Sequence, residues 1–131
     1  MVTAKQEALL RQAYRLFNDR QIDDLLALMT DDVEWPDVAN GAVLHGKGEI
    51  RPYWAGQFAV ADPRVVPIEF MPAGDDVVVV VDQRVLDFQG QTLAGPTVVF
   101  HRYTFADDLV RRMVVFADRE AARQTDHEPP A

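Results

Sequence analysis

The stretch DDVEWPDVANGAVLHGKGEIRPYW, residues 31–54, decides the fold because it sets a strand, a turn and a helix in one register. Residues 33–35 predict a short strand that Pro36 ends, and the N-G pair at residues 40–41 marks a turn. Asp37 therefore follows the end of a strand. Loops that leave a rigid scaffold are where proteins often place the side chains that face a cavity. We expect Asp37 to be such a residue.

Amphipathic helices flank this stretch on both sides. Residues 3–18 open with a capping-box pattern at Thr3 and Gln6 and carry apolar side chains at helical spacing. A shorter apolar stripe predicts a second helix over residues 22–29. The third helix is expected over residues 48–60, because a proline is tolerated only near its first turn. Three helices thus precede any long strand.

From residue 64 onward the apolar residues alternate as they do in strands. Strands are expected over residues 65–70, 77–87, 92–105 and 109–117. A bulge is expected near Gly95 and Pro96, because proline cannot donate to the ladder. This order predicts an α+β domain, a cone with an open mouth, in which three N-terminal helices pack in a curved, mixed, mainly antiparallel β-sheet. Residues 1–120 form this single domain, and residues 121–131 are expected to be a polar tail whose last residues are disordered.

The composition excludes several classes of function. The chain has 131 residues and a formal net charge of -8, without a lysine or arginine stripe, so we expect no nucleic-acid partner. It contains neither Ser nor Cys, which excludes serine and cysteine nucleophiles. No apolar run is long enough to span a membrane, so we expect no membrane partner. The N-terminus lacks a signal-peptide pattern, so we expect a cytoplasmic location. The spacing of His45, His101 and His127 does not suit a metal site, and we expect no metal and no cofactor.

Several motifs together resemble one known family. They are Tyr14 in the first helix, the T-D-D run at residues 30–32, the V-E-W-P-D run at 33–37 and the L-H-G entry to the third helix at 44–46, followed by hairpins. In this order and spacing the chain resembles the nuclear-transport-factor-2-like cone fold, in the branch of ketosteroid isomerases and SnoaL-like proteins. The resemblance implies that Asp37 stands where the isomerases have their general base and Tyr14 where they hold the substrate oxyanion. At the position of the second oxyanion donor, an acid in the isomerases, this chain has His101.

Strand alternation suggests the walls of the candidate cavity. If His101 points inward, so do Tyr103 and, on the next strand, Met113. The register that the resemblance implies turns Asp82 and Arg84 inward as well, although a shift by one residue would place both in solvent. His101 itself is either catalytic or a histidine satisfied by a neighbouring hydroxyl or carbonyl. The expected substrate-binding residues are Trp35, Trp54, Asp82, Arg84, Tyr103 and Met113.

Three functions stay open at this point. The first is a cofactor-free isomerase, cyclase or dehydratase that works by proton transfer, with Asp37 as base and with Tyr14 and His101 as donors to the substrate oxygen. The second is a module of the same fold that binds an apolar small molecule without catalysis. The third is an epoxide hydrolase, which rests only on Asp82 and Arg84.

The expected outer face of the sheet predicts self-association. Val98, Phe100, Val114 and Phe116 would form an apolar patch that a monomer leaves exposed to water. We therefore expect a homodimer through this face, with Arg102 and Arg112 near the rim of the interface. The resemblance suggests the same assembly.

Overall fold

The computed structural model describes residues 1–124 of the chain. Helix α1 (Ala4–Asn18) begins at Thr3, whose side chain accepts a hydrogen bond from the backbone N–H of Gln6 while the Gln6 side chain accepts one from the Thr3 N–H. The other helices are α2 (Ile22–Leu26), the short 3-10 helix η1 (Val38–Asn40), α3 (Lys47–Val60) and α4 (Arg119–Arg123). No helix among the described residues is both long and apolar enough to cross a membrane.

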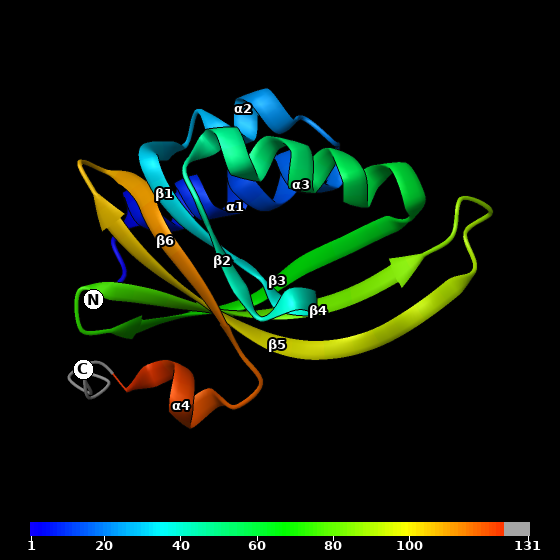
Figure 1. Ribbon diagram of the computed structural model, residues 1–131. Helices are drawn as coiled ribbons and strands as arrows, with labels where there is room; N and C mark the ends of the chain where they lie inside the picture. Colours follow the sequence, from blue (N-terminus) through cyan, green and yellow to red (C-terminus); the bar gives the residue numbers. More distant parts are fainter. Residues whose placement is uncertain (125–131) are drawn as a thin grey trace.

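One curved, mixed sheet forms the other layer (Figure 1). Its strands are β1 (Met29–Asp37), β2 (Ala42–His45), β3 (Asp62–Ala73), β4 (Asp76–Leu86), β5 (Thr92–Ala106) and β6 (Leu109–Phe116). Their order across the sheet is β2-β1-β6-β5-β4-β3. The pair β1–β6 is parallel, and the other neighbouring pairs are antiparallel. The predicted α+β cone with a mainly antiparallel sheet is confirmed.

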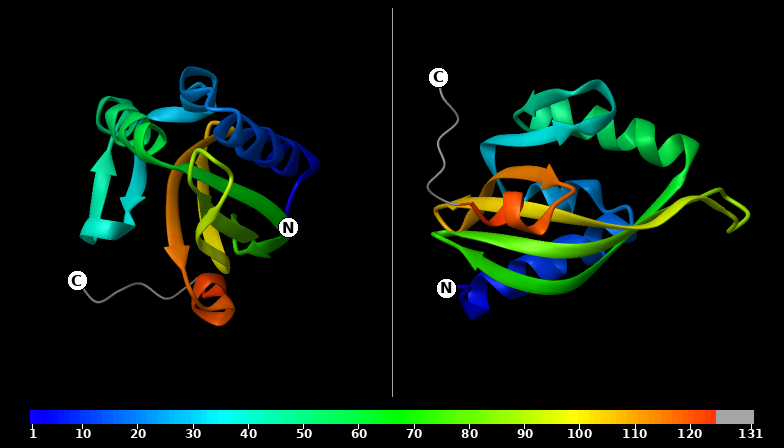
Figure 2. Two further views of the ribbon diagram at one scale, coloured as in Figure 1. Left: turned by 90° about the vertical axis from the view of Figure 1, so that its right-hand side faces the viewer. Right: turned by 90° about the horizontal axis from the view of Figure 1, so that it is seen from below.

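Helices α1, α2 and α3 cover one face of this sheet, and α4 lies against the opposite face (Figures 1 and 2). The main core lies on the α1–α3 side and includes Leu10, Val33 and Trp54, all fully buried. A smaller core lies under α4, where Ala122 packs with Phe100 and side chains from β3 and β4. The sheet is therefore apolar on both faces over part of its area.

Helix α4 crosses the expected domain boundary at residue 120. Ala122 is fully buried, and the guanidinium group of Arg102 donates to the Ala122 carbonyl at 3.1 Å and to the Asp76 carboxylate at 2.8 Å. Residues 121–123 thus belong to the domain and not to a polar tail. The disorder expected for the last residues falls on residues 125–131, which lie outside the described part of the chain.

The deciding stretch holds one more strand than predicted. Strand β1 runs through Pro36 to Asp37, because β2 pairs with it residue by residue from Glu34 opposite His45 to Asp37 opposite Ala42. Helix α2 ends before Met29, which is already the first residue of β1. Asp37 is consequently the last residue of a paired strand and is held more firmly than a residue in a free loop.

The facing of β4 differs from the expected one by one residue. Val77, Val79 and Val81 pack into the main core, and Gln83 and Val85 continue on that side and line the cavity described below. Asp82 and Arg84 alternate with these residues, and their side chains therefore lie on the opposite face of the strand. Five consecutive valines, residues 77–81, are all buried, so both faces of this strand are apolar and the alternation carries no information on which parity faces the helices.

The predicted bulge in β5 is confirmed. Gln83 lies opposite Thr97 and Val85 opposite Ala94, so two residues of β5, Gly95 and Pro96, face one residue of β4. Gly95 has a φ of 84°, and a Cβ atom there would lie 2.6 Å from the Gln83 carbonyl oxygen. Only glycine fits this position without moving the backbone.

Candidate functional site

A cavity of about 380 Å³ lies between the helices α1–α3 and the concave face of the sheet. Its lining comes from α1, α2, η1, α3 and from β1, β3, β4, β5 and β6, and among the described residues that form it none is Asp, Glu, Lys or Arg. Most of these side chains are apolar. The volume lies within the range of roughly 300–1,000 Å³ that is typical of small-molecule sites. The uncharged polar side chains in the lining are Tyr14, Tyr53, Gln57, Gln83, His101 and Tyr103.

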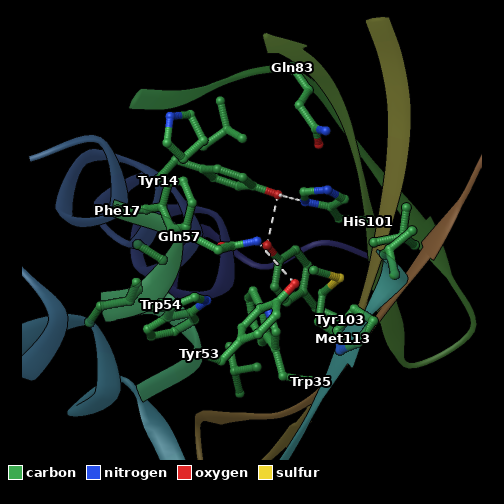
Figure 3. Close-up of a pocket in the computed structure, with 18 of the residues that line it drawn as sticks. Tyr14, Phe17, Trp35, Tyr53, Trp54, Gln57, Gln83, His101, Tyr103 and Met113 are labelled. Atoms are coloured by element: carbon green, nitrogen blue, oxygen red, sulfur yellow. Dashed lines mark hydrogen bonds between the residues drawn. The ribbon is translucent and has the colours of Figure 1, made fainter. Parts of the chain in front are cut away.

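Three of these side chains form a buried hydrogen-bonded network, which we call the tyrosine–histidine network. The hydroxyl group of Tyr14, on α1, forms hydrogen bonds with His101 and Tyr103, both on β5. Its hydroxyl oxygen lies 2.8 Å from Nδ1 of His101, and the Tyr103 hydroxyl donates to it at 2.8 Å (Figure 3). The exposed fractions are 5% for Tyr14, 6% for His101 and 3% for Tyr103. Alternation places His101 and Tyr103 on the same side of β5, and α1, which covers that side, supplies Tyr14.

A count of hydrogens shows what this network offers to a ligand. A neutral network carries one hydrogen on each hydroxyl and one on the imidazole, and its two internal hydrogen bonds use two of these. If Tyr14 donates to Nδ1, the remaining hydrogen is on Nε2 of His101. If Nδ1 carries the hydrogen and donates to Tyr14, the Tyr14 hydroxyl keeps a hydrogen for another acceptor. Either tautomer leaves one donor for a ligand oxygen.

Burial keeps the network neutral. It lowers the pKa of His101 from 6.5 to about 4, so the imidazole is uncharged at pH 7. The pKa of Tyr14 is raised well above its ordinary value, first by burial and then by the Tyr103 hydroxyl. Burial also raises the pKa of Tyr103. The network therefore presents neutral donors, and a charged imidazole plays no part in it near neutral pH.

A second polar group lies on α3. Tyr53 and Gln57 are one helical turn apart, and Nε2 of Gln57 donates to the Tyr53 hydroxyl oxygen at 3.1 Å (Figure 3). The pKa of Tyr53 is raised by burial and, to a lesser degree, by the negative charge of Asp37. We call these two residues the α3 pair. These two residues and Gln83 were not among the predicted site residues, although the spacing of Tyr53, Trp54 and Gln57 in the predicted third helix places all three on one side.

Asp37 lies beside the cavity and outside its lining. Its neighbours Pro36, Val38 and Ala39 line the cavity, whereas Asp37, a residue that is 8% exposed, turns its carboxylate to Asn40. It accepts hydrogen bonds from the Asn40 side-chain amide at 2.8 Å and from the Asn40 backbone N–H at 3.3 Å. Asp37 thereby caps η1.

The expected substrate-binding residues separate into two groups. Trp35, Trp54, Tyr103 and Met113 line the cavity, and the rings of the two tryptophans meet edge to face with centroids 5.2 Å apart. Asp82 and Arg84 do not line it, which corrects the expectation. They pair with each other at 3.2 Å on the opposite face of β4, where the Asp82 side chain is 30% exposed and the Arg84 side chain 42% exposed. Among residues 1–124, no three His, Asp or Glu side chains gather in a group that could hold a metal ion.

Solved structures of similar proteins share this fold. The crystal structure of TerC co-crystallised with polyporic acid has 29% sequence identity, covers 90% of this chain and 95% of that chain, and gives a TM-score of 0.74. An NTF2-like protein of unknown function from Burkholderia pseudomallei has 22% identity, coverages of 95% and 100%, and a TM-score of 0.74. RV0760c from Mycobacterium tuberculosis in complex with estradiol-17beta-hemisuccinate has 18% identity, coverages of 90% and 97%, and a TM-score of 0.74. The likenesses at 22% and 18% identity show the fold alone.

None of the curated proteins matches the sequence. The family model of the SnoaL-like domain matches residues 10–113, from the middle of α1 to the middle of β6. This range includes every residue that lines the cavity except Val115. The match spans well over half of the chain, and this protein therefore belongs to the SnoaL-like domain family.

Proposed function

We propose that this protein binds an apolar ring compound in the cavity and catalyses a cofactor-free proton transfer on it, as an isomerase, cyclase or dehydratase. The observation that carries the proposal is the tyrosine–histidine network, which keeps one hydrogen free for a ligand oxygen in an otherwise apolar cavity. Hydrogen-bond donors aimed at an oxygen where negative charge develops are an effective means of lowering a barrier. The apolar lining would strengthen their effect.

In this mechanism the one free hydrogen of the network, on the Tyr14 hydroxyl or on Nε2 of His101, is donated to the substrate oxygen and Asp37 accepts the proton. Asp37 is supported by its position between cavity-lining residues and by the influence of its charge on the pKa of Tyr53. To reach a substrate, its carboxylate would exchange the hydrogen bond from the Asn40 side chain for the substrate proton. A substrate carbon near Pro36 and Val38 would be within its reach.

Two of the similar proteins were crystallised with small molecules, polyporic acid in TerC and estradiol-17beta-hemisuccinate in RV0760c. These compounds are therefore the first ligands to test for binding to this protein. Binding by either would establish the cavity as a ligand site and would provide a displacement assay for other ring compounds.

The test of the catalytic proposal is Asp37→Asn, assayed against a panel of ring compounds with carbonyl or hydroxy-aromatic groups. We expect turnover to fall by at least about 100-fold while ligand affinity stays near that of the wild type, because the amide keeps the shape but cannot accept the proton. Asp31→Asn is the matched control, because Asp31 is an exposed acid of the same strand. An unchanged rate in Asp37→Asn on a substrate of the wild type would show that Asp37 is not the base.

A binding module without catalysis is the second candidate function. The observation that favours it is that the Asp37 carboxylate is already held by Asn40 and does not line the cavity. Tight binding of apolar rings without turnover of any compound in the panel would select this candidate. The epoxide-hydrolase alternative loses its support, because Asp82 and Arg84 lie outside the cavity.

We also propose a homodimer through the outer face of the sheet, on a smaller patch than expected. Val98 and Val114 are 51% and 36% exposed, whereas Phe100 and Phe116 pack in the core beneath α4. Arg102 holds α4 and does not lie at an open rim, and Arg112 pairs with Glu34 at 3.0 Å.

Light scattering at micromolar concentration should give twice the 14.8 kDa mass of one chain. Val98→Glu should lower that mass toward the monomer, because the interface would then bury a charge. A monomeric mass for the wild type would contradict the dimer.

A further inference from the structure

The α3 pair is a hydrogen-bonded group of its own within the cavity. Tyr53 and Gln57 line the same space as the tyrosine–histidine network, and among the described residues no hydrogen bond joins the two groups. Figure 3 shows both groups with their polar atoms directed into the interior of the site. A ligand that fills the cavity therefore meets two separate sets of polar atoms.

The α3 pair keeps both a donor and an acceptor free. Gln57 donates one amide hydrogen to the Tyr53 oxygen, which leaves the hydrogen of the Tyr53 hydroxyl, the second amide hydrogen of Gln57 and the carbonyl oxygen of Gln57 without a partner in residues 1–124. Both side chains are half-buried. A ligand that excluded water from them without replacing its hydrogen bonds would lose affinity.

The charges around the α3 pair restrict what can bind there. No charged side chain lines the cavity within the described residues, and the negative charge of Asp37 is close enough to raise the pKa of Tyr53. That charge disfavours a second anion at this place. A hydroxyl group fits, because it accepts from Tyr53 and donates to Gln57 with one oxygen atom.

We propose that the α3 pair is a second recognition point, so that the ligand class is an uncharged ring compound with two oxygens: an acceptor oxygen at the tyrosine–histidine network and a hydroxyl group at Tyr53 and Gln57. This inference rests on the proposed function in one respect, which is that the ligand binds in the same cavity. It does not require catalysis.

Calorimetric titration with naphthalene, naphthol and the isomers of dihydroxynaphthalene tests the inference. At least one diol isomer, whose spacing matches the two groups, should bind the wild-type protein roughly 5 to 30-fold more tightly than naphthol, the gain of one well-placed hydrogen-bonding group. Tyr53→Phe and Gln57→Leu should each remove most of this gain and leave the affinity for naphthol unchanged. Hydroxynaphthoate, which brings a carboxylate in place of the second hydroxyl, should bind less tightly than the best diol.

Arg51→Met is the matched control on the same helix, because Arg51 pairs with Asp23 on the surface and does not line the cavity. It should keep the full preference for the diol. The inference is overturned if no diol isomer binds more tightly than naphthol, if the preference survives both substitutions on α3, or if hydroxynaphthoate binds most tightly. If the wild-type protein turned over no compound of the panel while the diol preference stayed intact, catalysis would be refuted and this inference would stand.

Discussion

Replacement of Tyr14 by phenylalanine should lower the free energy of unfolding by about 2–6 kcal/mol. Tyr14 is the middle member of the tyrosine–histidine network, so loss of its hydroxyl leaves both the Tyr103 hydroxyl and Nδ1 of His101 without a partner. Each buried polar group that loses its hydrogen bond costs about 1–3 kcal/mol. Urea unfolding followed by tryptophan fluorescence measures the loss, since both tryptophans lie in the cavity wall.

Tyr103→Phe is the comparison, because it removes the same hydroxyl group from the end of the network. The hydrogen bond between the Tyr14 hydroxyl and His101 remains, so only one hydrogen bond is lost and the cost should be about 0.5–1.5 kcal/mol. Equal losses in the two variants would show that water in the cavity replaces the missing partners, and would contradict the burial on which the prediction depends.

The free energy of unfolding should decrease as the pH falls, because His101 is protonated more easily in the unfolded chain than in the folded one. Burial lowers the pKa of this histidine from 6.5 to about 4, so the unfolded chain takes up a proton at a higher pH than the folded one. The corresponding stability is fully present above pH 6.5 and is lost as the pH falls to about 4. A shift of this size corresponds to about 3 kcal/mol.

The measurement compares the wild type with His101→Gln in urea unfolding series from pH 7 to pH 4. Other groups titrate in this range, and the difference between the two proteins isolates the histidine. The difference in unfolding free energy should decrease by about 3 kcal/mol over the range, because the variant has no imidazole to protonate. Parallel curves would show that His101 does not resist protonation in the folded protein.

The sequence predicts the elements of this fold well where a local rule decides them. The capping box at Thr3, the helical spacing that follows it and the Gly95-Pro96 bulge all depend on residues close together in the chain. Helix α4 was missed because its stability comes from distant partners, above all the guanidinium group of Arg102. Five residues with one buried alanine give too weak a pattern to predict a helix.

The site was predictable only in part for the same reason. Tyr14, His101 and Tyr103 meet across α1 and β5. Alternation along β5 links Tyr103 to His101, whereas Tyr14 was indicated only by the family resemblance. The facing of Asp82 and Arg84 could not, because the valines before them are buried on both faces of the sheet. The turn of Asp37 toward Asn40 depends on a side-chain rotamer, which no sequence pattern specifies.

The hollow between the helices and the sheet has a consequence for how this protein can evolve. A chain of this size gains stability by filling its interior, yet the walls around this space hold small side chains such as Ala13 and Ala39. A larger apolar residue at Ala13 would occupy the space, add packing contacts and make the empty protein more stable. It would also take the room of any ligand. Selection for stability alone would therefore favour a filled cavity, and the open space costs the protein stability that a larger residue would provide.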